Sequence, residues 1–173
     1  MRVALRLPRE ADAAAHMALP PSVEMMRMYG HAAEAPPVPS EERSRDWYER
    51  LVAMPHPRVI EADGAAVGAV LLREVDETDR RARLAIGLWG ETNVGRGIGR
   101  RAIGLMLDEA FGDLGLHRVA LRVLAFNARA IRCYEACGFR REGVEREAAL
   151  VGGERFDDVM MGILAREHRS AHT

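Results

Sequence analysis

The fold is decided by ten residues near the middle of the chain, Asn93-Val94-Gly95-Arg96-Gly97-Ile98-Gly99-Arg100-Arg101-Ala102. A segment of alternating hydropathy, 81–88, precedes them, and a segment with apolar residues at helical spacing, 98–111, follows. The pattern predicts a strand, a glycine-rich loop and the first turn of a helix. Such loops bind phosphate groups, because glycine lets backbone N–H groups converge on an anion and the helix N-terminus is electropositive.

The glycine spacing distinguishes this loop from two common phosphate sites. A dinucleotide fingerprint needs G-x-G-x-x-G after the first strand of a βαβ series. Here Gly95, Gly97 and Gly99 form G-x-G-x-G after the last strand of an antiparallel meander. A P-loop needs a lysine, and all 25 basic residues of this chain are arginine. A flexible loop ahead of a helix stays open as an alternative at this point.

Composition restricts the class of protein. A chain of 173 residues with 48% hydrophobic and 29% charged residues fits one globular domain. The net charge of −1 offers no basic field for nucleic acid, and no apolar run approaches the roughly 20 residues of a membrane span. Cys133 and Cys137 lack metal-site spacing, so we expect packing roles, no metal and a cytoplasmic location.

Hydrophobic periodicity predicts the remaining elements. The expected strands cover 3–7, 56–62, 65–75, 81–88, 119–123, 139–150 and 154–164, and the expected helices cover 9–19, 22–28, 41–54, 98–111 and 127–136. This order predicts an α+β fold with one β-α-β crossover, at the glycine loop. We expect a single domain over residues 1–165 and a polar, frayed tail over residues 166–173.

The glycine loop resembles the acetyl-CoA-binding motif Q/R-x-x-G-x-G/A of the GNAT superfamily of N-acetyltransferases. Gly97 and Gly99 fall on the two motif positions, while Val94 stands where the family usually has Gln or Arg. A loop arginine would then supply the missing positive charge. The resemblance implies that acetyl-CoA is bound by Val94, Gly95, Arg96, Gly97, Ile98, Gly99, Arg100 and Arg101.

A second resemblance covers residues 127–139, which fit the family segment N-x-x-[AS]-x-x-x-Y-x-x-x-G-F. It implies that Asn127 and Ala130 contact the pantetheine arm and that Tyr134 protonates the departing CoA thiolate. Taken singly, an N-cap Asn and a packed Tyr explain these residues as well; two motifs in the family's order favour the functional interpretation. The final strand, 154–164, looks most like the ribosomal-protein N-terminal acetyltransferase (RimJ/RimL-type) branch.

The resemblance implies a mixed central sheet of about seven strands flanked by about four helices, with the CoA site where two middle strands splay apart. The implied activity is direct transfer of acetyl from acetyl-CoA to an amine, either a protein N-terminus or a small molecule. The backbone N–H of Leu88 or Trp89 would bind the developing oxyanion. The resemblance also makes a homodimer possible, because dimers are common in the family, although the sequence shows no clear interface. A catalytically weak acyl-CoA sensor is the alternative function.

The acceptor side is less defined. Many relatives carry a glutamate where this chain has Ala85, so we expect either a low-pKa amine or a base acting through water, for which Glu91 is the candidate. A solvated loop carboxylate is the competing interpretation of Glu91. Five glutamates of the variable helices are candidates for attracting a cationic acceptor: Glu24, Glu34, Glu41, Glu42 and Glu49.

Overall fold

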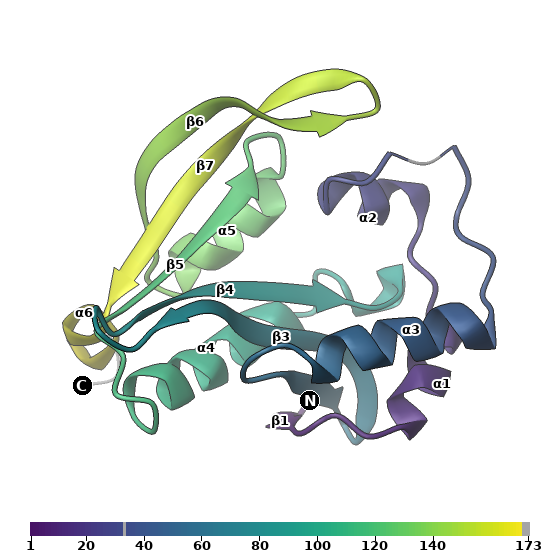
Figure 1. The fold of residues 1–173 in the computed structure, drawn as a ribbon, viewed down its shortest axis with the longest axis horizontal. Coiled ribbons are helices and arrows are strands. Elements are labelled where there is room, and N and C mark those ends of the chain that lie inside the picture. Colours follow the sequence, from purple (N-terminus) through teal and green to yellow (C-terminus); the bar gives the residue numbers. More distant parts are fainter. Residues whose placement is uncertain (33, 171–173) are drawn as a thin grey trace.

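The computed structural model describes residues 1–32 and 34–170. Within them, a seven-stranded sheet is flanked by six α-helices (Figure 1). The strands are β1 (Val3–Arg6), β2 (Arg58–Ala62), β3 (Ala65–Asp76), β4 (Arg81–Leu88), β5 (Arg118–Leu124), β6 (Arg140–Val151) and β7 (Glu154–Leu164). The helices are α1 (Ala11–Ala18), α2 (Val23–Met28), α3 (Glu41–Val52), α4 (Ile98–Phe111), α5 (Ala128–Ala136) and α6 (Ala165–Ser170), with a 3-10 turn, η1, at Glu91–Asn93.

The sheet is mixed, and its strand order is β1-β2-β3-β4-β5-β7-β6. The strands β1 to β4 form an antiparallel meander, β4 and β5 are parallel, and β7 pairs antiparallel with both β5 and β6. The α+β class, the seven strands and the single crossover through α4 confirm the sequence prediction. The described residues form six α-helices, where the resemblance implied about four and periodicity predicted five; α6 is the one that no pattern predicted.

Both faces of the sheet are covered by helices, as alternate residues of β3 demonstrate. Val70 and Leu72 belong to the main core, which they share with the apolar stripe of α4. Ala69 and Leu71 point to the opposite face and pack in a smaller core with Trp47 of α3. The period of two along the strand therefore separates an α4–α5 layer from an α1–α3 layer.

The predicted frayed tail is wrong for residues 166–170, which belong to helix α6. The ring of His168 is buried, and its Nε2 lies 2.6 Å from Asp108 Oδ1 of α4. The backbone N–H of Leu164 also donates to the Glu167 carboxylate across 2.9 Å. The first contact ties the polar segment to α4 and the second caps its helix locally, neither of which its composition alone indicates. Residues 171–173 of the predicted tail lie outside the described residues.

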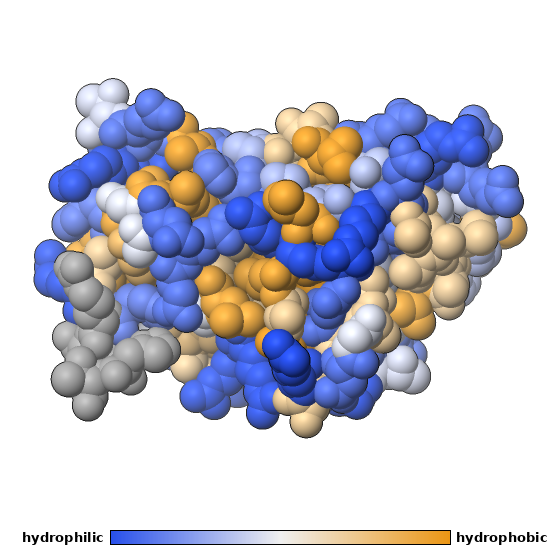
Figure 2. Space-filling model, turned by 90° about the horizontal axis from the view of Figure 1, so that it is seen from below, coloured by the Kyte–Doolittle hydropathy of each residue, from blue (hydrophilic) through white to orange (hydrophobic). Residues whose placement is uncertain are grey.

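The surface carries apolar residues in separate patches. Figure 2 shows one face, on which apolar side chains lie in several groups between hydrophilic ones. In the part of the chain that the structure describes, no helix has the length and apolar character needed to cross a membrane.

Candidate active site

Strands β4 and β5 pair over only part of their length. Their parallel register joins Arg81–Arg83 of β4 with Arg118–Ala120 of β5. Beyond these residues the strands diverge, so residues 84–88 lack a partner strand on the β5 side (Figure 1). The expected splay is confirmed. Because α4 follows β4 directly, the glycine loop lies at the mouth of this opening.

The glycine loop has a backbone that requires glycine at two positions. Gly95 and Gly97 both have φ of +78°, in the left-handed region, and a Cβ at either would meet no atom within 4 Å. Conformation rather than crowding therefore selects glycine here. Gly97 is the N-cap of α4, and the first helical hydrogen bond runs from Arg101 N to Gly97 O over 3.2 Å. The N–H groups of the first turn thus have no intrahelical acceptor, which gives this end a capacity for anions.

A groove of about 330 Å³ lies between the loop, the splayed end of β4 and α5. We call it the glycine-loop groove. It brings together most of the residues predicted to bind acetyl-CoA: Leu88, Val94, Gly95, Gly97, Ile98, Gly99, Arg100, Asn127, Ala130 and Tyr134. Residues 94–100 and residues 127–134, which are far apart in sequence, therefore face one cavity.

Three arginines line the glycine-loop groove: Arg100, Arg129 and Arg132. Arg100 was a predicted ligand, whereas the sequence analysis missed the two on α5. Their spacing of three on a helix that begins with a motif residue was the available signal. Guanidinium groups bind phosphate oxygens well, so these side chains are suited to supply the positive charge that Val94 lacks.

Tyr134 lies in the glycine-loop groove and in a second cavity behind the splay. Its ring meets that of Phe139 edge-on, with the ring centroids 5.9 Å apart. Burial, and the nearby Cys133, raise the pKa of the Tyr134 phenol above its usual value. The hydroxyl therefore keeps its proton throughout the neutral range.

Asn127 has a structural role that occupies both ends of its side chain. Its Oδ1 accepts a hydrogen bond from Ala130 N over 3.1 Å and so caps α5, while its Nδ2 donates to Met28 O over 3.2 Å. The side chain is buried. Asn127 therefore anchors the end of α2 to the start of α5, beside the groove that it lines.

Tyr29, which follows α2, forms a hydrogen bond with the backbone N–H of Leu88, the predicted oxyanion donor. The Leu88 N–H donates to the Tyr29 hydroxyl over 3.1 Å, and this hydroxyl lies 3.4 Å from Leu88 O, to which it donates. Burial is the main cause that raises the pKa of Tyr29. No motif pointed to Tyr29, because the contact joins residues 59 positions apart in the chain.

Trp89 lies away from the glycine-loop groove. Its N–H donates to Val67 O over 2.8 Å, and its buried ring meets the ring of Trp47 edge-on at 4.9 Å. Of the two predicted oxyanion donors, Trp89 is therefore committed to the sheet. Leu88, at the splayed edge, is the one that faces the groove.

Three other predicted residues also lie outside the groove lining. The Glu91 carboxylate accepts a hydrogen bond from the Ser22 hydroxyl, which itself accepts from Met25 N and caps α2. Arg101 donates to the backbone carbonyl of Met1. Arg96 is exposed on the loop. The structure therefore does not bring Glu91 to Tyr134. Glu91 instead fixes the start of α2 through Ser22.

The two cysteines lie on α5 and differ in environment. Cys133 lines the glycine-loop groove and packs against the main core. A hydrogen bond with Cys137 and the charge of Arg100 lower the pKa of the Cys133 thiol below its usual value. Cys137 lies 3.7 Å from Arg100 O through its sulfur, and its pKa is raised, mainly by the same hydrogen bond. Both thiols are free.

Two further cavities lie beside the groove, and Tyr29 lines both. The helix cavity, about 660 Å³, lies between β4 and α3 and includes Gly87, Leu88 and Trp47. The sheet cavity, about 500 Å³, lies over the splayed strands and includes Ala85 and Tyr134.

The sheet cavity holds a buried acid that the sequence analysis missed. Asp158 of β7 is 4% exposed, and its carboxylate is 3.6 Å from Arg122 Nη1. Burial raises the pKa of this carboxyl, although Arg122 opposes the shift. In the sequence, Asp158 is one of two adjacent aspartates in a strand, and only the sheet shows that it is buried.

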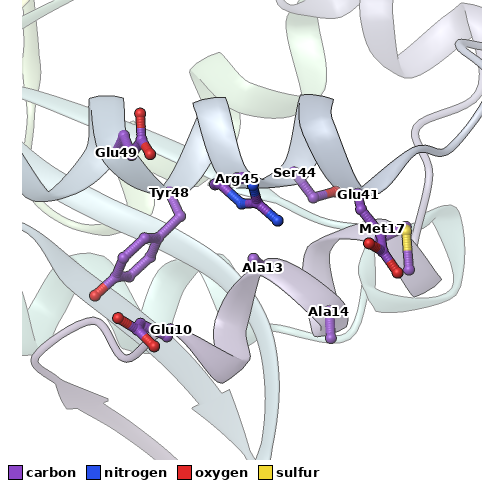
Figure 3. Close-up of a pocket in the computed structure, with 9 residues that line it drawn as sticks. All are labelled: Glu10, Ala13, Ala14, Met17, Glu41, Ser44, Arg45, Tyr48 and Glu49. Atoms are coloured by element: carbon purple, nitrogen blue, oxygen red, sulfur yellow. The ribbon is translucent and has the colours of Figure 1, made fainter.

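The five glutamates considered for cation binding do not line the two cavities beside Tyr29. Glu41 and Glu49 face a groove between α1 and α3, with Glu10 of the loop before α1 (Figure 3). Glu34 lines a cavity beside the β6–β7 hairpin. None of the five therefore faces the two cavities beside Tyr29, and a role in attracting a cationic acceptor stays a prediction.

Comparison with known proteins identifies the family. The sequence model of the acetyltransferase (GNAT) domain matches residues 2–140. The spermidine N(1)-acetyltransferase of Escherichia coli K12 is 32% identical over 114 residues, which cover 66% of this chain and 61% of that protein. The putative ribosomal N-acetyltransferase YdaF of Bacillus subtilis 168 is 33% identical over 106 residues, covering 61% and 57%. The matched parts thus span about three fifths of these relatives, and both substrate types occur among them, so the ribosomal branch is not singled out.

The fold has a similar solved relative. The crystal structure of spermidine N-acetyltransferase from Vibrio cholerae, in complex with CoA and spermine, superposes with a TM-score of 0.79 and 28% identity. The superposition covers 96% of this chain and 98% of that one.

Proposed function

Because the chain belongs to the acetyltransferase (GNAT) domain family, we propose that it transfers acetyl from acetyl-CoA directly to an amine. One observation carries the proposal. A loop with anion-binding backbone, an apolar channel along splayed β4 and a buried, protonated tyrosine line a single groove. A pyrophosphate, a pantetheine arm and a thiolate leaving group need these three features in this order.

Acetyl-CoA fits the residues of the glycine-loop groove. Backbone N–H groups at the start of α4, with Arg100, Arg129 and Arg132, would bind the phosphates. Ile86, Leu88 and Ala130 give the apolar part of the lining. The acetyl group would then reach the end of β4 near Tyr29 and Tyr134.

The reaction forms a bond between the amine nitrogen and the acetyl carbon and breaks the bond between that carbon and sulfur. Leu88 N–H is suited to bind the carbonyl oxygen as negative charge develops on it, provided that the Tyr29 hydroxyl releases it. Tyr134 would give its proton to the departing thiolate, whose conjugate acid has a pKa of about 8.5.

The amine must lose a proton, and Asp158 is better placed than Glu91 to receive it. Asp158 lines the same cavity as Tyr134 and Ala85, whereas Glu91 is bonded to Ser22. Its raised pKa also makes it a stronger base than an ordinary aspartate. Asp158, rather than Glu91, is therefore our candidate for the general base.

The test is release of CoA thiol from acetyl-CoA with a panel of amines, together with mass detection of the acetylated amine. Stoichiometric thiol and amide support the proposed function. Tight acetyl-CoA binding without amide formation from any amine would support the alternative, an acyl-CoA sensor, for which the occupied Leu88 N–H is the favouring observation.

A further inference from the structure

The charges around the thioester end of the groove restrict the acceptor. Resting on the proposed function, we propose that the acceptor is a small amine that also carries a carboxylate, of the amino-acid class with an apolar side chain, and not a polyamine. The carboxylate would bind in the helix cavity at Arg43 and Arg50 of α3.

The acceptor approaches from the sheet face opposite α4. Leu84 of β4 is in the main core against α4, so Ala85 and Gly87, at alternate positions, face the other way. Ala85 lines the sheet cavity and Gly87 the helix cavity. Because Tyr29 lines both cavities and the glycine-loop groove, the acceptor nitrogen meets the thioester near this side chain.

The helix cavity has an excess of positive charge. Arg43 and Arg50 line it against one acidic side chain, Asp46. Arg43, Trp47 and Arg50 are spaced four and three residues apart, which places them on one face of α3. Within residues 1–32 and 34–170, neither arginine forms an ion pair, so both guanidinium groups are available to an anion.

The sheet cavity repeats this charge pattern. Its charged lining is Arg73, Arg83, Arg122 and Asp158. Arg83 pairs with Glu74 across 2.9 Å and Arg122 faces Asp158 at 3.6 Å, so these two arginines are partly neutralised. Neither cavity therefore offers the carboxylate-rich wall that a polycation would need. A polyamine would place several ammonium groups beside arginines, which is repulsive, whereas a carboxylate can accept two hydrogen bonds from one guanidinium.

Part of the wall of the helix cavity is aromatic. The His16 ring stacks on Trp47 with centroids 4.3 Å apart and planes inclined by 7°, and Trp89 meets both rings edge-on. Burial lowers the pKa of His16 to about 4, so its ring is neutral at pH 7. Flat apolar surface beside two arginines suits the side chain and the carboxylate of one molecule.

Helix α3 also supplies a matched control. Arg45 lies on the face that lines the groove toward α1, with Glu41 and Tyr48, as Figure 3 shows. It shares helix, residue type and exposure with Arg43 and Arg50 but lines neither cavity beside Tyr29.

The experiment compares kcat/KM by thiol release for spermidine, for L-phenylalanine and L-methionine, and for the amides of the same two amino acids. We expect the free acids to exceed spermidine at least tenfold. Arg43→Gln and Arg50→Gln should each lower the acid-to-amide ratio by about 10- to 100-fold, the range for hydrogen bonds to charged groups. Arg45→Gln should leave this ratio unchanged. The free acid and the amide differ in amine pKa. This difference cancels when the acid-to-amide ratio of a variant is compared with that of the wild type.

Preference for spermidine, or an unchanged ratio in both Arg43→Gln and Arg50→Gln, would overturn this inference while leaving acetyl transfer intact. If only Arg73→Gln, in the sheet cavity, lowered the acid-to-amide ratio, the assignment of the carboxylate site to the helix cavity would be overturned. No thiol release with any of the amines, in a protein that binds acetyl-CoA, would overturn the proposed function as well.

Discussion

The hydroxyl of Tyr29 accepts a hydrogen bond from the backbone N–H of Leu88 over 3.1 Å, at the splayed end of β4. This N–H is the donor that the proposed reaction needs for the acetyl carbonyl. Tyr29 therefore competes with the thioester for one hydrogen bond, and it must move before acetyl-CoA is fully engaged.

Removing this competitor should strengthen acetyl-CoA binding. Since a typical hydrogen bond contributes about 0.5–1.5 kcal/mol net, Tyr29→Phe should lower the KM for acetyl-CoA by about 2- to 10-fold. Initial rates at saturating amine measure this. A KM that instead rises, with a fall in kcat, would mean that the Tyr29 hydroxyl assists the reaction.

Tyr134 should act on the chemical step. Loss of a general acid typically costs about 10²- to 10⁴-fold, so Tyr134→Phe should lower kcat within this range and leave acetyl-CoA affinity nearly unchanged. Tyr48→Phe, on the α1 side of α3, is the control and should behave as wild type. An unaltered kcat in Tyr134→Phe would remove this residue from the mechanism.

The ionised Asp158 carboxylate should support activity but lower the stability of the folded protein. Its folded-state pKa is raised by burial, so ionisation of this carboxyl disfavours the native state as pH rises through that pKa. We expect Asp158→Asn to be at least as stable as wild type at pH 7, with the difference vanishing below the ordinary aspartate range. Urea unfolding at several pH values tests this.

The same variant should lose activity if Asp158 is the base. We expect kcat/KM to fall by about 10²-fold or more and its acid limb to disappear from the pH profile. A preserved acid limb would show that another group takes the amine proton.

The glycine loop should tolerate no side chain at Gly97. Its φ of +78° places alanine in a left-handed conformation that costs roughly 1–2 kcal/mol, so Gly97→Ala should unfold at lower urea concentration and bind acetyl-CoA more weakly. Gly104→Ala is the control within α4. A Cβ there meets nothing within 4 Å, and helix propensity should raise stability by roughly 0.5–1 kcal/mol.

Cys133 should be the more reactive thiol. Its lowered pKa predicts that iodoacetamide reacts with it faster than with an ordinary thiol near neutral pH, and acetyl-CoA should protect it because it lines the glycine-loop groove. Cys137→Ala should move the Cys133 pKa upward, since it removes the hydrogen bond that lowers it. Peptide mapping by mass spectrometry measures both effects; equal labelling of the two cysteines would contradict the assignment.

The sequence by itself determined the parts of this protein that depend on neighbours in the chain. The strand at 81–88, the glycine loop before the helix and the cap at Asn127 are local features, and each appears in the structure as expected. The order of the two motifs was sufficient to predict the family and to predict that Tyr134 shares a groove with the glycine loop.

Only the tertiary structure decided which groups face the reacting atoms. The Tyr29 hydroxyl bonds to Leu88, 59 positions away, and the Ser22 hydroxyl bonds to Glu91, 69 positions away. The two residues that flank α2 therefore engage both the predicted oxyanion donor and the predicted base. Asp158 becomes a candidate base because the sheet buries it, and Arg43 and Arg50 become candidate anion ligands because α3 turns them toward β4. These outcomes depend on the packing of distant segments, about which periodicity and spacing carry no information.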